Sequence, residues 1–498
     1  MTLFDCADQL ALRVPTSCGR AGHCHECVVE VTRGSESLSA RTGDEAFLRG
    51  NYRLACQAFL LGEPSEVTFS LLRRSPKILT TSVPSGPIEC DRHNGYGIAM
   101  DLGTTTVVME LVDLRTGATV YQSSFDNPQR FGGSDVMHRI SYDGGPFRGE
   151  LQKAIIGAVN GEIRDLCRDL DIGRREIVEA MVAGNSTMRD LFFGLDVQPI
   201  GQRPYKSITE ARATTTLEEP AHRLGILADP QARVMSPPLV ASHVGADTTA
   251  ALIAIGMETQ RETVMLVDVG TNTEVVVGNS ERMMAASCPA GPAFEGGLVR
   301  YGMPGGDGAI ESAALVDGGL EYSVIGGGEP RGICGSGLID ILAELRRHEQ
   351  MTPMGVFSRK RREVSIAPGF GITLSREDAS NLAQAKAANF CGQAIVMRKF
   401  GVTPSAISKL YLAGGFANYV NARNAIEIGF LAPVAEDRIA KIGNASLQGA
   451  KELLLSERKR KLAETLVRRI EHVELETQAD FFDLFVEGCQ FKPMPTGD

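Results

Sequence analysis

The sequence lacks the long apolar run that a membrane helix requires. No stretch approaches the ~18–20 uncharged apolar residues that span a bilayer. A basic N-terminus is missing as well, because Asp5 and Asp8 stand where a secretory signal peptide carries Lys or Arg. Both absences argue against a membrane-spanning or secreted chain. We therefore expect a cytoplasmic protein without a membrane partner.

A surplus of positive charge is also missing. The chain has 51 Lys and Arg against 61 Asp and Glu, which gives a formal net charge of −10. Binding to nucleic acid depends on a surplus of Lys and Arg near phosphates, so we exclude nucleic acid as a partner. The hydrophobic fraction of 43% is typical of a globular protein. A chain of 498 residues is too long for one ordinary core, and we expect about two to four domains.

The cysteines are numerous and unevenly spread. In a cytoplasmic protein, the 11 cysteines should be metal ligands, reactive thiols or small core residues rather than disulfides. Seven of them are scattered, and we interpret each as a small buried side chain. The scattered cysteines are Cys6, Cys90, Cys167, Cys288, Cys334, Cys391 and Cys489. The other four gather near the N-terminus, and such clustering needs a cause.

These four cysteines predict a [2Fe–2S] cluster. Cys18, Cys24 and Cys27 follow a C-x5-C-x2-C spacing, and Cys56 stands alone further along the chain. Four thiolates, two for each iron, are the ligands that this cluster requires. Glycines in the first gap would let the backbone wrap the cluster closely and direct N–H groups at its sulfurs.

Zinc is the alternative metal for this segment. His23 and His25 lie among the cysteines and could serve as spare ligands. Zinc sites more often pair two short hooks such as C-x2-C or H-x3-H, whereas Cys56 stands alone. The pattern therefore favours the iron–sulfur cluster and leaves zinc open.

The segment around the cysteines resembles a ferredoxin domain of the adrenodoxin-like spacing class, over residues 1–74. Such domains open with a β-hairpin, and a helix then leads into the cluster loop. Here the expected helix, Phe4 to Leu12, begins almost at Met1. The resemblance thus implies a truncated β-grasp fold that is short of two strands, or a true start further upstream. Residues 75–95 are rich in Pro, Ser, Gly and charge, and we interpret them as an extended linker.

Two later segments share one pattern. Each has an apolar strand, then Asp-x-Gly-Thr-x-Thr, then an alternating strand, which predicts a β-hairpin with a Gly-Thr tip. The segments are YGIAMDLGTTTVVMELVD at 96–113 and VMLVDVGTNTEVVVGN at 264–279. One such turn would be weak evidence, because Asp and Gly are common in turns. Two copies in long hairpins indicate a duplicated domain with a site between its halves.

The two predicted tips have the chemistry of a phosphate site. Gly103 and Gly270 would let the backbone approach oxyanions, and the tip N–H groups and Thr hydroxyls would supply donors. Asp101 and Asp268 can hold Mg²⁺ through water. The candidate nucleotide-binding residues at the tips are Gly103, Thr104, Thr105, Thr106, Gly270, Thr271, Asn272 and Thr273.

Two glycine-rich segments complete the candidate nucleotide site. In KLYLAGGFANYVNARNAIEIG (409–429), an apolar strand runs into Gly414 and Gly415, where a flat nucleobase or ribose could lie against the backbone. A glycine turn that packs strand on helix explains this segment equally well. In GICGSGLIDILAEL (332–345), a Gly-rich loop enters a helix whose N-terminus could face an anion.

Together these segments resemble the actin–hexokinase–Hsp70 class of ATPases and sugar kinases. The resemblance implies a multidomain protein with an adenosine segment at Leu412–Phe416 and two α/β lobes of the ribonuclease-H type, at 96–258 and 259–498. Several longer segments are similar to the ATP-dependent reductive activators of corrinoid proteins. They are YGIAMDLGTTT, NPQRFGGSDVMHRI, VAGNSTMRDLFFG, SHVGADTTAA, SCPAGPAFEGGLVRYGM and GICGSGLID.

The second resemblance implies a function. Such activators join a ferredoxin domain to an ATPase and use ATP to reduce an inactive Co(II) corrinoid protein to its Co(I) form, one electron passing through the [2Fe–2S] cluster. It implies ATP, Mg²⁺ and the cluster as cofactors. The implied partners are a corrinoid methyl-transfer protein and a low-potential electron donor, and a homodimer is compatible with the resemblance. Full-length activators usually carry a further small domain before the ATPase, and the linker leaves no room for one.

Asp247, in LVASHVGADTTAALIAIG, is the candidate catalytic residue. The segment resembles the one that carries the catalytic Asp of glycerol-kinase-like sugar kinases, which implies that Asp247 orients or deprotonates the attacking water. The alternative is an N-cap role for a helix that starts at Thr248. Asn185, in VAGNSTM, could support the site, but an amide cannot act as a base.

Two other functions stay open. A small-molecule kinase of the sugar-kinase class with a redox-sensing ferredoxin domain would share both hairpins, and Asp247 could serve as its base. A non-enzymatic iron–sulfur regulatory module would use the cluster only to report redox state. ATP consumption that requires a corrinoid protein rather than a small molecule would favour the activator.

Overall fold

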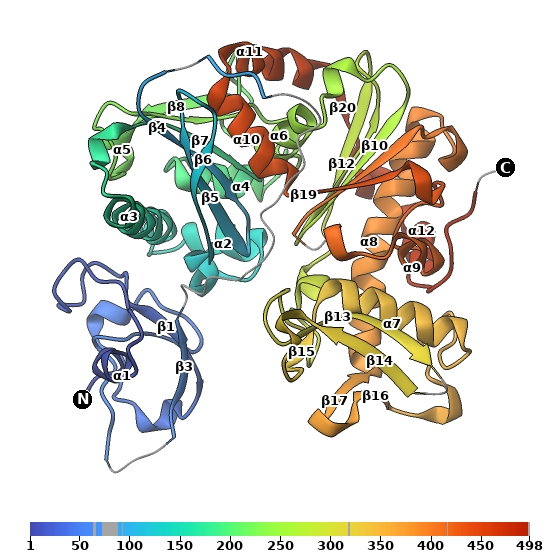
Figure 1. Cartoon of the computed structure of the whole chain (residues 1–498), viewed down its shortest axis with the longest axis horizontal. Helices are drawn as coiled ribbons and strands as arrows, with labels where there is room; N and C mark the ends of the chain where they lie inside the picture. Colours follow the sequence, from blue (N-terminus) through green and yellow to red (C-terminus); the bar gives the residue numbers. More distant parts are fainter. Residues whose placement is uncertain (63–65, 72–87, 92, 317–318, 416, 497–498) are drawn as a thin grey trace. The chain divides into compact units, whose positions relative to one another are not determined.

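The chain folds into two compact units (Figure 1). The computed structural model describes the chain apart from residues 63–65, 72–87, 92, 317–318, 416 and 497–498. The first unit comprises Met1–Ser75, Glu89–Pro238 and Leu453–Glu457, and the second contains Leu239–Glu452 and Arg458–Asp498. Most of the predicted linker at 75–95 lies outside the described residues. No helix in the described part of the chain is long and apolar enough to cross a bilayer.

The N-terminal domain combines one short helix with a three-stranded sheet. Helix α1 (Leu3–Gln9) starts at a capping box, in which the Thr2 hydroxyl accepts from the Asp5 N–H and the Asp5 carboxylate accepts from the Thr2 N–H. It ends before the predicted Leu12, because Ala11 adopts a positive φ of 54°. The antiparallel sheet has the order β2-β1-β3, with β1 (Val28–Arg33), β2 (Tyr52–Leu54) and β3 (Thr68–Leu71).

A six-stranded sheet forms the rest of the first unit, with the order β6-β5-β4-β7-β9-β8. Strands β4, β5 and β6 make an antiparallel meander, and β7 and β9 follow parallel on the other side of β4. The strands are β4 (Tyr96–Leu102), β5 (Thr106–Asp113), β6 (Thr119–Asp126), β7 (Ile177–Gly184), β8 (Leu217–Pro220) and β9 (Arg233–Ser236). The helices are α2 (Val136–Asp143), α3 (Glu150–Leu170), α4 (Ser186–Phe192) and α5 (Ala221–Leu224).

The sheet of the second unit repeats this topology. Its order is β19-β18-β10-β11-β12-β20, so β12-β11-β10-β18-β19 corresponds to β6-β5-β4-β7-β9 in both order and direction. The strands are β10 (Val264–Val269), β11 (Thr273–Gly278), β12 (Met283–Cys288), β18 (Lys409–Ala413), β19 (Ile439–Gly443) and β20 (Ile470–His472). The predicted duplication of an α/β lobe is confirmed.

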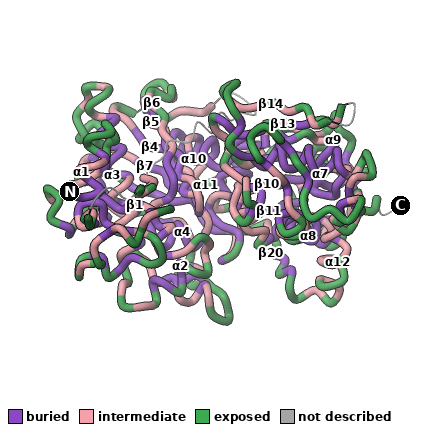
Figure 2. The backbone as a smooth tube through the Cα atoms, turned by 90° about the horizontal axis from the view of Figure 1, so that it is seen from below, coloured by how far each residue is buried: buried purple, intermediate pink, exposed green. Residues whose placement is uncertain are grey.

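Helices and two small sheets complete the second unit, and much of α7 and α8 is buried (Figure 2). The helices are α6 (Ala246–Ala254), α7 (Gly335–Arg347), α8 (Arg376–Phe400), α9 (Ala422–Glu427), α10 (Ala445–Leu455), α11 (Glu457–Leu466) and α12 (Phe481–Gly488). The end of α10 and the first residue of α11 group with the first unit. The small sheets contain β13 (Ala309–Val316), β14 (Gly319–Val324) and β15 (Gly332–Ile333), and β16 (Glu363–Ala367) and β17 (Ile372–Ser375). Helix α6 groups with this unit, whereas the lobe boundary at residue 258 stays a prediction.

One apolar core joins the N-terminal domain to the first large sheet. Buried side chains of the domain, such as Phe47 and Leu54, belong to the same cluster as Phe131, Tyr142 and Leu151. The two parts of the first unit are therefore packed against each other through side chains, and a change in one can be felt by the other.

Candidate functional site

Strand pairing brings two of the four clustered cysteines together. The register of β1 and β2 places Val28 opposite Leu54, so Cys27 and Cys56 lie at the same end of the pair. Their sulfurs are 3.3 Å apart, and both side chains are buried. A hydrogen bond from the Cys27 thiol lowers the pKa of Cys56 to about 7, and the same bond raises the pKa of Cys27.

The other two cysteines, Cys18 and Cys24, share one hydroxyl group. The Oγ1 atom of Thr16 lies 3.9 Å from each of their sulfurs. Burial acts to raise the pKa of Cys18, but hydrogen bonds from Cys24 and Thr16 outweigh it and lower that pKa to about 6. Because metals bind thiolates rather than thiols, a lowered thiol pKa suits a metal site.

The loop that carries these cysteines turns through left-handed backbone. Gly19, Arg20, Gly22 and His25 have φ values of 62°, 70°, 93° and 60°. A Cβ atom at Gly22 would lie only 2.8 Å from Oδ2 of Asp44. Glycine is therefore the residue that fits at this turn, as the expected close wrapping of the loop requires.

The four sulfurs thus form two pairs, which suits a two-iron cluster with two thiolates for each iron. Within the described ranges, no group of three or more His, Cys, Asp or Glu side chains is close enough to hold a single metal ion. His25, a spare ligand in the zinc alternative, instead places its Nδ1 atom 2.6 Å from Oε2 of Glu150. The donor set fits the predicted [2Fe–2S] cluster.

Loss of one thiol should remove the cluster without harming the nucleotide site. We expect Cys56→Ala, prepared without air, to lose the visible absorbance of the protein and still to bind an ATP analogue, because the thiols and the nucleotide-binding hairpins lie in separate domains. The wild type should contain about two irons and two sulfides per chain. Cys489→Ala, at a scattered cysteine of the second unit, is the control and should keep its colour. One equivalent of zinc and no visible absorbance in the wild type would contradict the cluster.

The first predicted phosphate hairpin is formed by β4 and β5. Asp101 lies near the end of β4, and residues 103–105 form the tip. The N–H of Gly103 donates to the carbonyl of Thr106 at 3.1 Å. A Cβ atom at Gly103 would lie 2.5 Å from that same carbonyl oxygen, so the turn can only close this tightly around a glycine.

Asn185 contacts this tip from the start of helix α4. As the N-cap, its Oδ1 atom accepts from the N–H of Met188 at 3.0 Å. Its Nδ2 atom donates to Oγ1 of Thr104 at 2.9 Å. The amide therefore holds the hydroxyl of a candidate phosphate ligand, and the supporting role of Asn185 stays a prediction.

The second predicted hairpin is formed by β10 and β11. Residues 270–272 form its tip, where the N–H of Gly270 donates to the carbonyl of Asn272 at 3.1 Å. The hydroxyl of Thr271 donates to the carboxylate of Glu295. The strands and the tip correspond to those of the first hairpin, so both predicted hairpins are present.

Glu274 is a candidate functional residue that we did not identify from the sequence. It lies opposite Asp268 in the β10–β11 pair and is only 8% exposed. Burial, followed by the negative charges of Asp247 and Asp268, raises its pKa well above the ordinary value. Ser287 donates a hydrogen bond to Oε1 of Glu274 at 3.0 Å. The signal was present in the sequence, as a single carboxylate within the apolar run TEVVVG.

Asp247 belongs to the same acidic group of the second unit, because its charge acts on Glu274. Helix α6 begins at Ala246, with Gly245 as the N-cap. The alternative in which Asp247 caps a helix that starts at Thr248 is therefore wrong, since the helix starts two residues earlier. The Oδ1 atom of Asp247 accepts from the Thr248 N–H at 2.8 Å from within the first turn.

The glycine pair after β18 lies beside the second hairpin. Gly414 has a φ of 114°, and a Cβ atom there would lie 2.1 Å from the carbonyl oxygen of Val269. Close backbone packing thus explains Gly414 by itself. A nucleobase-binding role for Gly414 and Gly415 stays a prediction, and position 416 of the expected adenosine segment lies outside the described residues.

Three family models match the chain along most of its length. The 2Fe-2S iron-sulfur cluster binding domain matches residues 1–61, the RACo middle region matches 96–260, and the C-terminal domain of RACo, the ASKHA domain, matches 262–496. Fold and sites therefore define the class of protein. It is an ATPase of two duplicated lobes that carries an N-terminal ferredoxin-type domain.

Two curated relatives and one solved structure are similar over most of the chain. "Corrinoid activation enzyme RamQ" of Eubacterium limosum is 32% identical, over 80% of this chain and 70% of the relative. The Co(II) methylated amine-specific corrinoid protein reductase of Methanosarcina barkeri is 24% identical, over 78% and 76%. The solved "Reductive activator for corrinoid,iron-sulfur protein" matches with a TM-score of 0.73 and 27% identity, over 100% of this chain and 96% of that one. The chain belongs to the family of RACo-type corrinoid activation enzymes.

Proposed function

We propose that this chain uses ATP to drive the one-electron reduction of a corrinoid protein from its Co(II) form to its Co(I) form. The observation that carries the proposal is that two different sites occur in one chain. Two pairs of thiols lie in a ferredoxin-type domain, and a phosphate hairpin lies in the lobe whose core that domain shares. The names of the related activators and reductases support the choice of substrate.

The thiols would hold the cluster that the N-terminal domain is built to bind. Cys18 and Cys24 would serve one iron, and Cys27 and Cys56 the other. When bound, a [2Fe–2S] cluster supplies a carrier for one electron at a time. The protein contributes the lowered pKa values of the Cys18 and Cys56 thiols and the left-handed loop that directs backbone toward the sulfurs.

The two hairpins would hold Mg²⁺ and the phosphates of ATP. Asp101 and Asp268 would bind the metal through water, since carboxylates are the ligands that Mg²⁺ prefers. Asp247 would orient or deprotonate the attacking water, and its negative charge acts on Glu274, whose pKa is raised by burial and by the charges of Asp247 and Asp268. Gly414 and Gly415 would lie against the adenosine.

A difference in reduction potential explains why an electron carrier would need ATP. Plant-type [2Fe–2S] ferredoxins have potentials near about −400 mV. If the cobalt couple lies lower, electron transfer is unfavourable by tenfold for every ~59 mV. ATP can offset this only if the enzyme binds the reactant and product states of its partner differently in its different nucleotide states. An external donor of low potential must supply the electron.

The spectrum of cobalt tests the proposal directly. Mixed without air with a reductant, ATP and a Co(II) corrinoid protein, the chain should produce Co(I), and its ATPase should run faster with that partner than alone. Omitting ATP, or using Cys24→Ala, should leave most of the cobalt as Co(II). Equal yields of Co(I) in these controls would refute the proposal, because the reductant would then act on cobalt directly. ATP consumption that needs a small molecule instead would favour the kinase.

Removal of either hairpin carboxylate should impair the use of Mg²⁺–ATP. We expect Asp101→Ala and Asp268→Ala each to lower ATP turnover by about 10-fold or more and to raise the Mg²⁺ concentration needed for half-maximal activity, because each variant loses a carboxylate aimed at the metal. Asp113→Asn, at the far end of strand β5, is the matched control and should behave like the wild type. Normal turnover in both Ala variants would show that the duplicated hairpins do not bind the metal.

Two further parts of the proposal concern the state of the protein in the cell. We expect it to act in the cytoplasm. A homodimer would have twice the 53.4 kDa mass of the chain. Sedimentation at several protein concentrations would measure that mass.

A further inference from the structure

Residues 127–143 contact the first phosphate hairpin at one end and the N-terminal domain at the other, and we call them the connecting segment. They include the 3₁₀ helix η3 (Pro128–Gly132) and helix α2. Most of this connecting segment is the stretch NPQRFGGSDVMHRI, to which the proposed function gives no role. Its contacts at both ends indicate what it does.

At one end, the connecting segment binds three consecutive carbonyl groups of the hairpin tip. The side chain of Asn127 donates to the Gly103 carbonyl at 2.8 Å, and its backbone N–H donates to the Thr105 carbonyl at 2.7 Å. Between them, Nη2 of Arg139 donates to the Thr104 carbonyl at 2.7 Å. The tip therefore cannot shift toward a bound phosphate without moving this segment or breaking these hydrogen bonds.

Arg139 ties the hairpin tip firmly to helix α2. Its side chain is fully buried, and it also donates to the Gly133 carbonyl at 3.1 Å and to Oε1 of Gln129 at 3.3 Å. A buried guanidinium that loses its acceptors is strongly destabilising, so Arg139 and its partners should move together. Movement of the tip should thus be passed to α2.

At the other end, α2 contacts the N-terminal domain through Tyr142. The Tyr142 hydroxyl, which is fully buried, donates to the Phe47 carbonyl at 2.7 Å. The Phe131 ring packs edge-on against the Tyr142 ring, with 5.6 Å between the ring centroids. It also packs edge-on against the Phe47 ring, with 5.4 Å between the centroids. The Phe47 ring in turn stacks on His25 at 4.0 Å, and His25 lies between Cys24 and Cys27 in the thiol loop.

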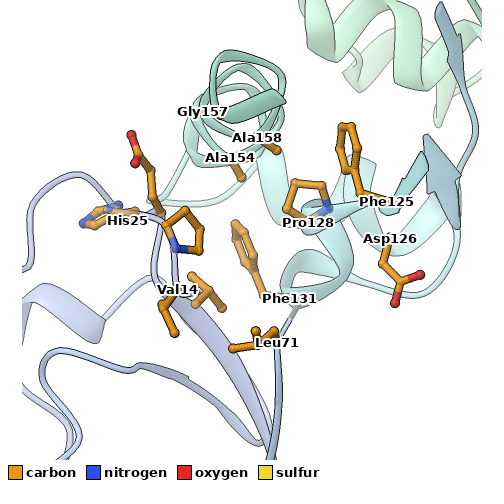
Figure 3. A pocket seen from close by; sticks show the side chains of 14 residues that line it. Val14, His25, Leu71, Phe125, Asp126, Pro128, Phe131, Ala154, Gly157 and Ala158 are labelled. Carbon is orange, nitrogen blue, oxygen red and sulfur yellow. The ribbon is translucent and has the colours of Figure 1, made fainter. Parts of the chain in front are cut away.

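A pocket next to Phe131 leaves room for this contact to change. Figure 3 shows the Phe131 ring directed into it, and Val14 and Leu71 of the N-terminal domain also line it. The opposite wall is formed by small residues of helix α3, including Ala154 and Gly157. Close-packed interiors resist movement, whereas unfilled space beside a ring lets it shift without opening the core.

We propose that Arg139 and Tyr142 are positioning residues that transmit nucleotide binding at the first hairpin to the thiol loop of the N-terminal domain. When the tip moves, Arg139 moves with it and displaces α2. Tyr142 on α2 then displaces Phe47, whose ring stacks on His25. The inference rests on the proposed function only in requiring that ATP binds this hairpin. Coupling of this kind is reciprocal, so the state of the N-terminal domain also changes the affinity for nucleotide.

Hydrogen exchange of the full chain with its cluster reconstituted tests this, with Mg²⁺ and the non-hydrolysable analogue AMP-PNP as the probe. In the wild type, AMP-PNP should slow exchange both in the hairpin, 101–106, and in the 43–52 segment, by about 5-fold or more in the latter. Tyr142→Phe keeps the ring and removes only the donor to Phe47. In this variant the slowing at 43–52 should fall below about 2-fold, while the hairpin stays protected. Arg139→Lys breaks the connection at its other end and should give the same result.

Tyr96→Phe, on strand β4 of the same unit, is the matched control and should keep both effects. A purely structural role would change exchange at 43–52 equally with and without AMP-PNP, so the nucleotide-dependent difference separates the two roles. The inference is overturned if both variants retain the slowing at 43–52, or if the wild type lacks it although its hairpin is protected. No corrinoid protein is needed, so failure to form Co(I) would refute the proposed function and leave this result standing.

Discussion

Replacing Asp247 with Asn should lower ATP turnover by about 10²–10⁴-fold and leave ATP bound. Asn has the shape of Asp but cannot take up a proton, so the variant removes the proposed base and little else. The side chain lies in the first turn of α6, where its charge acts on Glu274 beside Asp268. Phosphate release measures turnover, and titration with an ATP analogue measures binding.

Asp437→Asn, at an exposed position of the same unit, is the control for an Asp-to-Asn change and should turn over ATP normally. If Asp247→Asn also keeps its turnover but melts at a lower temperature, Asp247 serves only the N-terminus of α6, through the hydrogen bond that it accepts from Thr248. The role in activating water would then be wrong.

Replacing the buried Lys386 with Met should stabilise the protein against unfolding by about 4 kcal/mol at pH 7. The Lys386 side chain lies fully buried on α8, with Nζ 3.5 Å from the Gly429 carbonyl and near the rings of Phe390 and Phe491. Burial lowers its pKa from 10.5 to about 7. Met fits such a site because it is unbranched and packs well against aromatic rings.

The pH dependence of this gain identifies its cause. In the unfolded chain, Lys386 takes up its proton as the pH falls through 10.5, whereas in the folded chain it does so only near pH 7, its pKa there being lowered. The unfolded state is therefore favoured progressively as the pH falls between these values, and stability is lost over that range. The variant has no such loss, so its advantage should be about 2 kcal/mol smaller at pH 9 than at pH 7.

Denaturant unfolding at the two pH values measures both quantities. Lys399→Met, at an exposed position of the same helix, is the control and should change stability little at either pH. An equal gain at pH 7 and pH 9 would mean that Met improves packing and that the charge of Lys386 is not the cause. A loss of stability would mean that the ammonium makes favourable contacts in the folded protein.

The sequence by itself determined the clustered thiols, the two hairpins and the duplicated lobe. A short local sequence pattern specifies each of these features. The C-x5-C-x2-C spacing needs only one loop, and each hairpin needs only two alternating strands with Asp-x-Gly-Thr between them. Because the hairpin pattern occurs twice, the repeat of β4–β5 in β10–β11 could be predicted before any contact was known.

Only the tertiary structure decided which side chains meet across long separations in the chain. Glu274 was hidden within an apolar strand, and it became a candidate because the cross-strand register and α6 bring two further carboxylates near it. Tyr142 and Phe47 are 95 positions apart, and Arg139 and Thr104 are 35 apart. A local pattern specifies a strand, a turn or a cap, whereas burial and partner choice depend on how distant elements pack together. For that reason the candidate residues at the hairpin tips could be proposed from the sequence, whereas their contacts with residues 127–143 could not.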